Sequence, residues 1–155
     1  MSESASPSTS ITPHLVCADA LKAIEFYKQA FNAVEEMKLL GPTGKLVHGS
    51  MSIAGARFML AEEMPDWGSL GPNALKGSPV VIHLIVPDVD ATIAQAIAAG
   101  ATLVMPAADM FWGDRYGQIK DPFGHRWSIA TPKQSLTPAQ MQAAMEKAFG
   151  SGGPC

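Results

Sequence analysis

Two histidines and two arginines recur at one fixed spacing. His14 and His83 are 69 residues apart, and so are Arg57 and Arg126. An imidazole can bind a metal ion or carry a proton near neutral pH, and a guanidinium group can hold an anion through two parallel hydrogen bonds. Two simpler interpretations stay open. The histidines could line a polar wall, and the arginines could pair with surface carboxylates where strands begin.

The same spacing joins two longer segments. Glycine, arginine, an aromatic residue, an aliphatic residue and alanine follow one another in residues 55–61 and again in residues 124–130. The spacing also relates Asp19 to Asp88. A segment that repeats at a fixed distance indicates two copies of one structural unit. We therefore expect two similar modules that position the histidines and arginines in equivalent places.

Hydrophobic periodicity predicts the elements of each module. In the first module, residues 11–63, we expect a strand at 11–17, a helix capped by Asp19 and ending at Phe31, and strands at 33–40, 46–53 and 56–62. In the second, residues 80–131, we expect a strand at 80–86, a helix capped by Asp88 or Asp90 and ending at Ala99, and strands at 101–106, 113–120 and 125–131. Both modules therefore read β-α-β-β-β.

Three further segments complete the chain. Residues 64–79 contain several glycines and prolines, which indicates a linker loop between the modules, and a second role as a flap over a cavity stays open. Residues 1–10 are Ser-rich and predict a disordered tail. In residues 132–155, Thr137 and Pro138 open a helix that runs to about Phe149 and is followed by a tail. The apolar stripe of this helix predicts packing on the body or on a second subunit.

The motifs of the chain resemble those of one superfamily. Residues 111–116 (Phe-Trp-Gly-Asp-Arg-Tyr) and 121–125 (Asp-Pro-Phe-Gly-His) carry most of the resemblance, with 13–16 and 24–27 in support. They are similar to the vicinal oxygen chelate superfamily of glyoxalase I, extradiol dioxygenases and bleomycin resistance proteins, and within it to the PhnB-like branch. The resemblance implies an α+β fold whose two modules form strongly curved mixed sheets around a cavity, followed here by a C-terminal helix.

The resemblance also implies metal ligands on the first and last strands of each module. Those places fall on Thr12, Met59, Val81 and Ser128 in this chain. These side chains do not make a divalent metal site, which requires about three His or carboxylate ligands. We therefore expect no metal cofactor. The alternative is a displaced divalent ion held by His14 and His83, each two residues beyond a family position.

Strand alternation assigns the remaining candidates to faces. If Met59 and Ser128 face the cavity, so do Arg57 and Arg126, whereas Phe58, Leu60, Trp127 and Ile129 face the helices. Trp112, Asp114, Arg115 and Tyr116 could recognise a small molecule by stacking and hydrogen bonds; alternatively Trp112 plugs an edge and Asp114 pairs with Arg115. The ligand-binding candidates are His14, Arg57, Met59, His83, Trp112, Arg115, Arg126 and Ser128.

Composition limits the possible functions. A net charge of −3 without a basic run argues against nucleic acid, and no apolar run reaches the roughly 18 residues of a membrane span. Cys17 and Cys155 indicate a reducing, cytoplasmic setting rather than a disulfide framework.

We expect a homodimer, since pairing would cover open sheet edges and complete the cavity. The predicted function is binding of a small organic ligand, anionic if the arginines contact it, without a family-type metal site. The alternative is a metal-dependent lyase, isomerase or dioxygenase that uses His14 and His83. The sequence identifies no catalytic residue.

Overall fold

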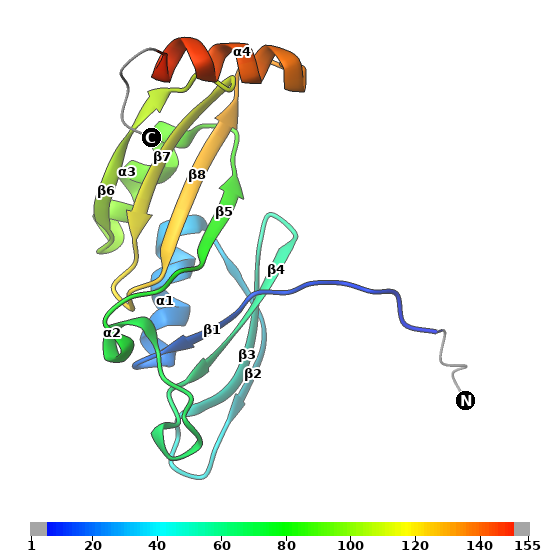
Figure 1. Cartoon of the computed structure of the whole chain (residues 1–155). Helices are drawn as coiled ribbons and strands as arrows, with labels where there is room; N and C mark the ends of the chain where they lie inside the picture. Colours follow the sequence, from blue (N-terminus) through cyan, green and yellow to red (C-terminus); the bar gives the residue numbers. More distant parts are fainter. Residues whose placement is uncertain (1–5, 151–155) are drawn as a thin grey trace.

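Two β-α-β-β-β modules make up most of the protein (Figure 1). The structure is a computed structural model that describes residues 6–150. Each module forms a four-stranded mixed sheet, and a further helix follows the second module. The predicted α+β class is therefore confirmed. Within the predicted tail, residues 6–10 form no helix or strand; residues 1–5 and Cys155 lie outside the described range.

The first sheet has the strand order β1-β4-β3-β2. Its module consists of β1 (His14–Cys17), α1 (Ala20–Phe31), β2 (Val34–Leu40), β3 (Leu46–Ile53) and β4 (Ala56–Glu62). β1 is parallel to β4, and the other pairs are antiparallel. The β3–β4 hairpin turns at Ala54 and Gly55, and both have the positive φ that a tight two-residue turn requires. β1 begins later than predicted, because Pro13 has no N–H to donate to the sheet.

The second sheet repeats this arrangement with the order β5-β8-β7-β6. Its module consists of β5 (Val81–Ile85), α3 (Val89–Ala99), β6 (Thr102–Asp109), β7 (Asp114–Lys120) and β8 (Arg126–Pro132). The prediction that the strand after α3 ends at Pro106 is wrong. β6 is an edge strand whose register with β7 shifts between Met105 and Ala108, so a residue without an N–H is tolerated there.

Side chains from the ends of strands hold the start of each module's helix. Asp19 and Asp88 cap α1 and α3, and their carboxylates accept hydrogen bonds from the backbone of the first turn. Glu62, at the end of β4, accepts from the N–H groups of Asp19 and Ala20. At the end of β8, Thr131 Oγ1 accepts from the N–H at the start of α3. These bonds satisfy donors that a helix cannot pair internally.

The apolar core lies between the sheets and the two helices. Phe58, Leu60, Trp127 and Ile129 are buried, as strand alternation predicts. The modules are joined through α1 and α3, where Gln95 Nε2 donates to Gln29 O at 2.8 Å.

Asp121 adds a second connection between the modules. Its Oδ2 accepts hydrogen bonds from Tyr27 Oη of α1 and from Trp127 Nε1, and its Oδ1 accepts from the N–H groups of Phe123 and His125. Burial, reinforced by the Asp121 charge, raises the pKa of Tyr27 well above its ordinary value.

The segment between the modules is more ordered than a loop. Residues 64–79 join the two modules and contain the short helices η1 (Pro65–Trp67) and α2 (Pro72–Leu75). Each proline stands at the first helical position, where its missing N–H costs no hydrogen bond. Asn73 Nδ2 donates to Pro122 O at 3.0 Å, so α2 is attached to the β7–β8 turn.

Helix α4 (Pro138–Phe149) has the predicted bounds and lies across one end of the second sheet (Figure 1). Thr137 and Gln140 form a reciprocal capping box at its start. None of its residues is buried, and it meets the body where the Phe149 ring lies edge-on to Phe111, with centroids 5.8 Å apart. In the described range, every helix is too short or too polar to cross a membrane.

Candidate functional site

The open face of the second sheet carries a polar and aromatic cluster. Strand pairing places His83 beside Ser128, and Ser128 beside Gln118. His83 Nδ1 and Ser128 Oγ are hydrogen-bonded at 2.7 Å, and Gln118 Nε2 donates to Tyr116 Oη at 2.8 Å. The rings of His83 and Tyr116 stack with centroids 6.1 Å apart. We name these four residues the aromatic cluster; none of them is a carboxylate.

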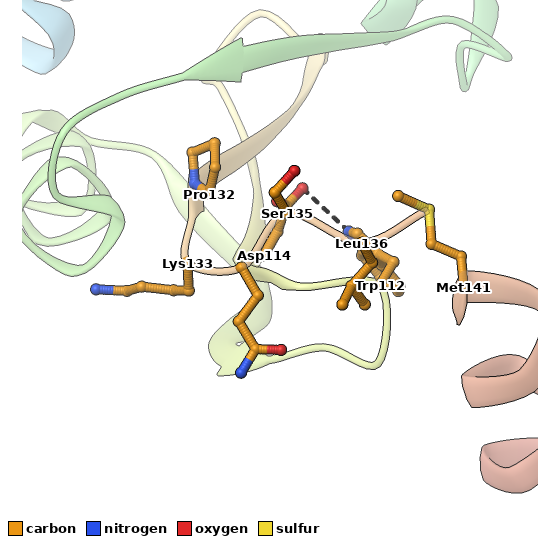
Figure 2. Close-up of a pocket in the computed structure, with 8 residues that line it drawn as sticks. Trp112, Asp114, Pro132, Lys133, Ser135, Leu136 and Met141 are labelled. Atoms are coloured by element: carbon orange, nitrogen blue, oxygen red, sulfur yellow. Dashed lines mark hydrogen bonds between the residues drawn. The ribbon is translucent and has the colours of Figure 1, made fainter. Parts of the chain in front are cut away.

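Trp112 extends the aromatic cluster toward α4. Its ring meets Tyr116 edge-on with centroids 5.3 Å apart, and its Nε1 donates to Asp114 Oδ2 at 3.1 Å. A hollow of about 400 Å³ lies beside it, between the loop that carries Trp112, the segment after β8 and Met141 of α4 (Figure 2). Because Trp112 is half-buried and contacts both the cluster and this hollow, it can contribute to either.

Arg115 lies on the opposite, helix-covered face of the same sheet. Its Nε and Nη2 donate to both carboxylate oxygens of Asp90 in α3, at 2.6 and 3.0 Å, and its Nη1 donates to Asp109. Asp90, followed by Asp109, raises the pKa of Arg115, and Arg115 lowers the pKa of Asp90. The alternative of a local Asp114–Arg115 ion pair is wrong, because neighbouring residues of a strand point to opposite faces.

The first sheet presents a different set on its open face. His14 of β1 lies beside Met59 of β4, and its ring meets that of His48 on β3 with centroids 5.9 Å apart. His83 instead contacts Ser128 and Tyr116. The structure therefore gives the two repeat-related histidines separate partners.

A small hollow lies where the two modules meet. It has a volume of about 270 Å³ and is lined in part by His14, Val80, Ile82 and His125. His125 Nε2 lies 2.9 Å from Val16 O, which ties the β7–β8 turn to β1. Sites for drug-sized ligands usually enclose about 300–1,000 Å³, so this hollow is smaller than the inter-module cavity that the resemblance implies.

The two repeat-related arginines also differ in their surroundings. Arg57 is exposed, and its Nε donates to Glu36 Oε2 at 3.0 Å. Arg126 is exposed on β8 directly opposite Lys120 of β7. In residues 6–150 it has no carboxylate partner.

The residues at the family's ligand positions do not fit a divalent metal ion. Thr12, Met59, Val81 and Ser128 offer two hydroxyls and a thioether, and the Ser128 hydroxyl is already bonded to His83. Catalytic divalent sites require about three His or carboxylate ligands. Across residues 6–150, no three side chains of His, Cys, Asp or Glu are grouped to share an ion.

Two residues of the open faces, His48 and Gln118, were not predicted from the sequence. Their positions follow from hairpin register. With Ala54 and Gly55 as the turn, Ser50 pairs with Met59, so His48 lies on the face of His14. The turn at residues 121–124 likewise pairs Gln118 with Ser128. The sequence predicts the positions of these strands and turns closely, so it contains the hairpin register that places both residues.

Two β-α-β-β-β modules whose first and last strands pair in parallel define a protein of the glyoxalase fold class. The chain belongs to the Glyoxalase/Bleomycin resistance protein/Dioxygenase superfamily, whose family model matches residues 10–129. The superfamily predicted from the sequence is confirmed.

Several known proteins are similar to this chain in sequence or in fold. An uncharacterised protein of Mycobacterium bovis is 47% identical over 138 residues, which cover 87% of this chain and 91% of that protein. The crystal structure of an Arabidopsis thaliana gene product matches with a TM-score of 0.64 and 28% identity, over 80% of this chain and 99% of that one. A Bacillus cereus structure named as a putative 3-demethylubiquinone-9 3-methyltransferase, PhnB protein, matches with a TM-score of 0.60 and 16% identity, over 79% and 99%. At that identity the likeness shows the fold alone.

Proposed function

We propose that the protein binds a small organic ligand on the open faces of its sheets, without a family-type metal ion. The observation that carries the proposal is the aromatic cluster, in which the hydrogen-bonded pair of His83 and Ser128 adjoins Tyr116. Hydrogen-bonding groups beside stacked rings orient a flat, partly polar molecule. The cluster holds no carboxylate to complete an acid–base pair with His83.

The proposal includes a second copy of the chain that closes the cavity. Both open faces leave apolar side chains exposed. They are Val34, Met37 and Leu39 on the first sheet and Val81, Ile85 and Met105 on the second. A copy packed over these faces would bury them and enclose a larger volume than the single chain does. A monomeric mass in sedimentation would contradict this part of the proposal.

Two finer assignments belong to the same proposal. We place the chain in the PhnB-like branch on the motifs at residues 111–116 and 121–125, and a structure named PhnB protein shares the fold. We also propose a cytoplasmic location, supported by the free and fully buried thiol of Cys17. Burial raises the pKa of that thiol, which keeps it protonated and unreactive.

Ligand-observed NMR with a library of aromatic fragments tests the binding site. We expect fragments that bind the wild-type chain to bind Tyr116→Ala about tenfold more weakly, equivalent to about 1.4 kcal/mol. The matched control is Ile97→Ala, which shortens an exposed apolar side chain of α3, behind the sheet. Equal affinity for both variants would place the fragments elsewhere and contradict the proposed site.

Metal analysis separates binding from metal-dependent catalysis. We expect less than stoichiometric divalent metal in the protein purified without chelator. A stoichiometric ion that disappears in the double variant His14→Ala, His83→Ala would overturn the proposal and favour a lyase, isomerase or dioxygenase. The double variant must keep the wild-type circular dichroism spectrum for this comparison to count.

A further inference from the structure

A second hollow of about 400 Å³ lies between α2, the segment that follows it and the β7–β8 turn. Close contacts join α2 to the β7–β8 turn, which form two walls of this hollow. Asn73 Nδ2 donates to Pro122 O, and a Cβ added at Gly124 would lie 2.6 Å from Asn73 Oδ1. Because only glycine allows this approach, α2 is fixed against the turn, and the hollow is a stable feature of the fold.

Three cations line this hollow: Lys76, Lys120 and Arg126. Lys120 and Arg126 stand directly opposite each other on β7 and β8, so both side chains leave the same face of the sheet. Like charges in directly opposed positions destabilise a sheet. Within residues 6–150 the hollow has no carboxylate in its lining, and none of the three cations is ion-paired. The chain's net charge of −3 makes this local excess of positive charge more unusual.

The excess of positive charge is specific to the second module, as comparison with the first module shows. Arg57, the counterpart of Arg126, is paired with Glu36. The registers of the two hairpins show the second difference, because Ser52 lies opposite Arg57, whereas Lys120 lies opposite Arg126. In residues 6–150 the arginine of the second module therefore has no paired carboxylate, and a lysine lies opposite it where the first module has a serine.

We infer that this hollow binds a phosphate group, either free or carried by a small metabolite. A guanidinium group can donate two parallel hydrogen bonds to phosphate, and two ammonium groups add point charges. A tetrahedral dianion balances more of the three positive charges than a single carboxylate does. The site goes beyond the proposed function, because no residue of the aromatic cluster lines it. Either proposal can fail without the other.

Thermal unfolding of the full chain, titrated with inorganic phosphate, glycerol 3-phosphate or acetate at constant ionic strength, tests the site. We expect a saturable rise in Tm with either phosphate and little with acetate, because an anion that binds only the folded chain stabilises it. The Kd for phosphate should rise at least tenfold in Lys120→Gln and in Arg126→Gln. Lys147→Gln, which removes an exposed cation from α4, is the matched control and should leave Kd unchanged.

Each variant is also measured in chloride alone. Since Lys120→Gln relieves repulsion, its Tm without phosphate should equal or exceed that of the wild type. If Arg126→Gln fails to fold, Lys76→Gln carries the same test. Tighter binding of glycerol 3-phosphate than of inorganic phosphate supports a metabolite, and the reverse supports the free anion. The inference is overturned by the absence of a saturable shift, by equal weakening in Lys147→Gln, or by acetate binding as tightly as phosphate.

Discussion

The two modules share their helix-capping contacts but differ on the faces that they leave open. Asp19 and Asp88 occupy equivalent positions and cap equivalent helices. Glu62 and Thr131 are also equivalent, and each accepts a hydrogen bond from the N–H that starts its module's helix. One is a charged carboxylate and the other a neutral hydroxyl. The repeat therefore retains the contact while the chemical group changes.

The open faces have diverged further. His14 lies beside a thioether and a second imidazole, whereas His83 is hydrogen-bonded to a hydroxyl. Arg57 has a carboxylate partner, and Arg126 faces a lysine. Because these side chains support no helix cap and little of the core, they can change without loss of the fold. The aromatic cluster, on which we base the proposed function, lies entirely in the second module.

The largest expected difference between the modules concerns Asp121, in the β7–β8 turn, and Ser52, which lies 69 residues earlier in the chain. Asp121→Ala would leave four donors without their acceptor, from Tyr27, Trp127 and two backbone N–H groups. We expect the free energy of unfolding to fall by about 3–5 kcal/mol. Ser52→Ala removes one small buried hydroxyl and should cost about 1 kcal/mol or less. Urea denaturation measures both.

A milder substitution of Asp121 tests the role of its individual oxygen atoms. Asp121→Asn keeps one carbonyl oxygen for the backbone donors of the turn but cannot accept from every donor at Oδ2, so its loss should lie between those of wild type and Asp121→Ala. If Ser52→Ala proved as costly as Asp121→Ala, the hydroxyl of Ser52 would stabilise its module as much as the carboxylate of Asp121 stabilises the other. That result would contradict the observed contacts.

A smaller and nearly equal effect is expected at the two strand-end caps. Glu62→Ala and Thr131→Val each remove the acceptor at the start of a helix, and each should cost about 1–2 kcal/mol. Chemical denaturation of the two single variants measures the losses. Glu62 accepts from two N–H groups, and Thr131 Oγ1 accepts from one N–H and donates to Val86 O, so each variant loses two hydrogen bonds. We therefore expect values that agree within about 0.5 kcal/mol. A cost at one cap only would show that the modules do not share this contact energetically.

Much of the fold was predictable because local signals agreed with tertiary structure. The bounds predicted at residues 46–53 and 56–62 are those of β3 and β4, since the turn at Ala54-Gly55 sets the hairpin. The short helices within residues 65–75 were not predicted, because a proline that begins a short helix resembles a proline in a loop. Pro106 was misleading because an edge strand tolerates a proline that a central strand does not.

The sequence predicts which face of the sheet each candidate side chain occupies, but not which residues that side chain contacts. Alternation correctly separated Trp127 from Ser128, and register brings Ser128 to His83. The partner of Arg57 is on another strand of its sheet, and the main partner of Arg115 is on a helix. Such contacts depend on where elements distant in the chain are packed, and neither strand period nor local spacing contains that information.

The smallest predicted effect contrasts the two equivalent arginines without phosphate. Arg57→Gln removes an exposed ion pair, which should lower the free energy of unfolding by at most about 1 kcal/mol. Arg126→Gln removes a repulsion from Lys120 and should leave the free energy unchanged or slightly raised. Both differences should shrink in 1 M salt, where the Debye length falls to about 3 Å. Effects of the same sign and size at both positions would mean that Arg126 has a stabilising partner after all. Effects of opposite sign would show that the repeat places both arginines alike and gives only the first a carboxylate, which leaves the second available for an anion.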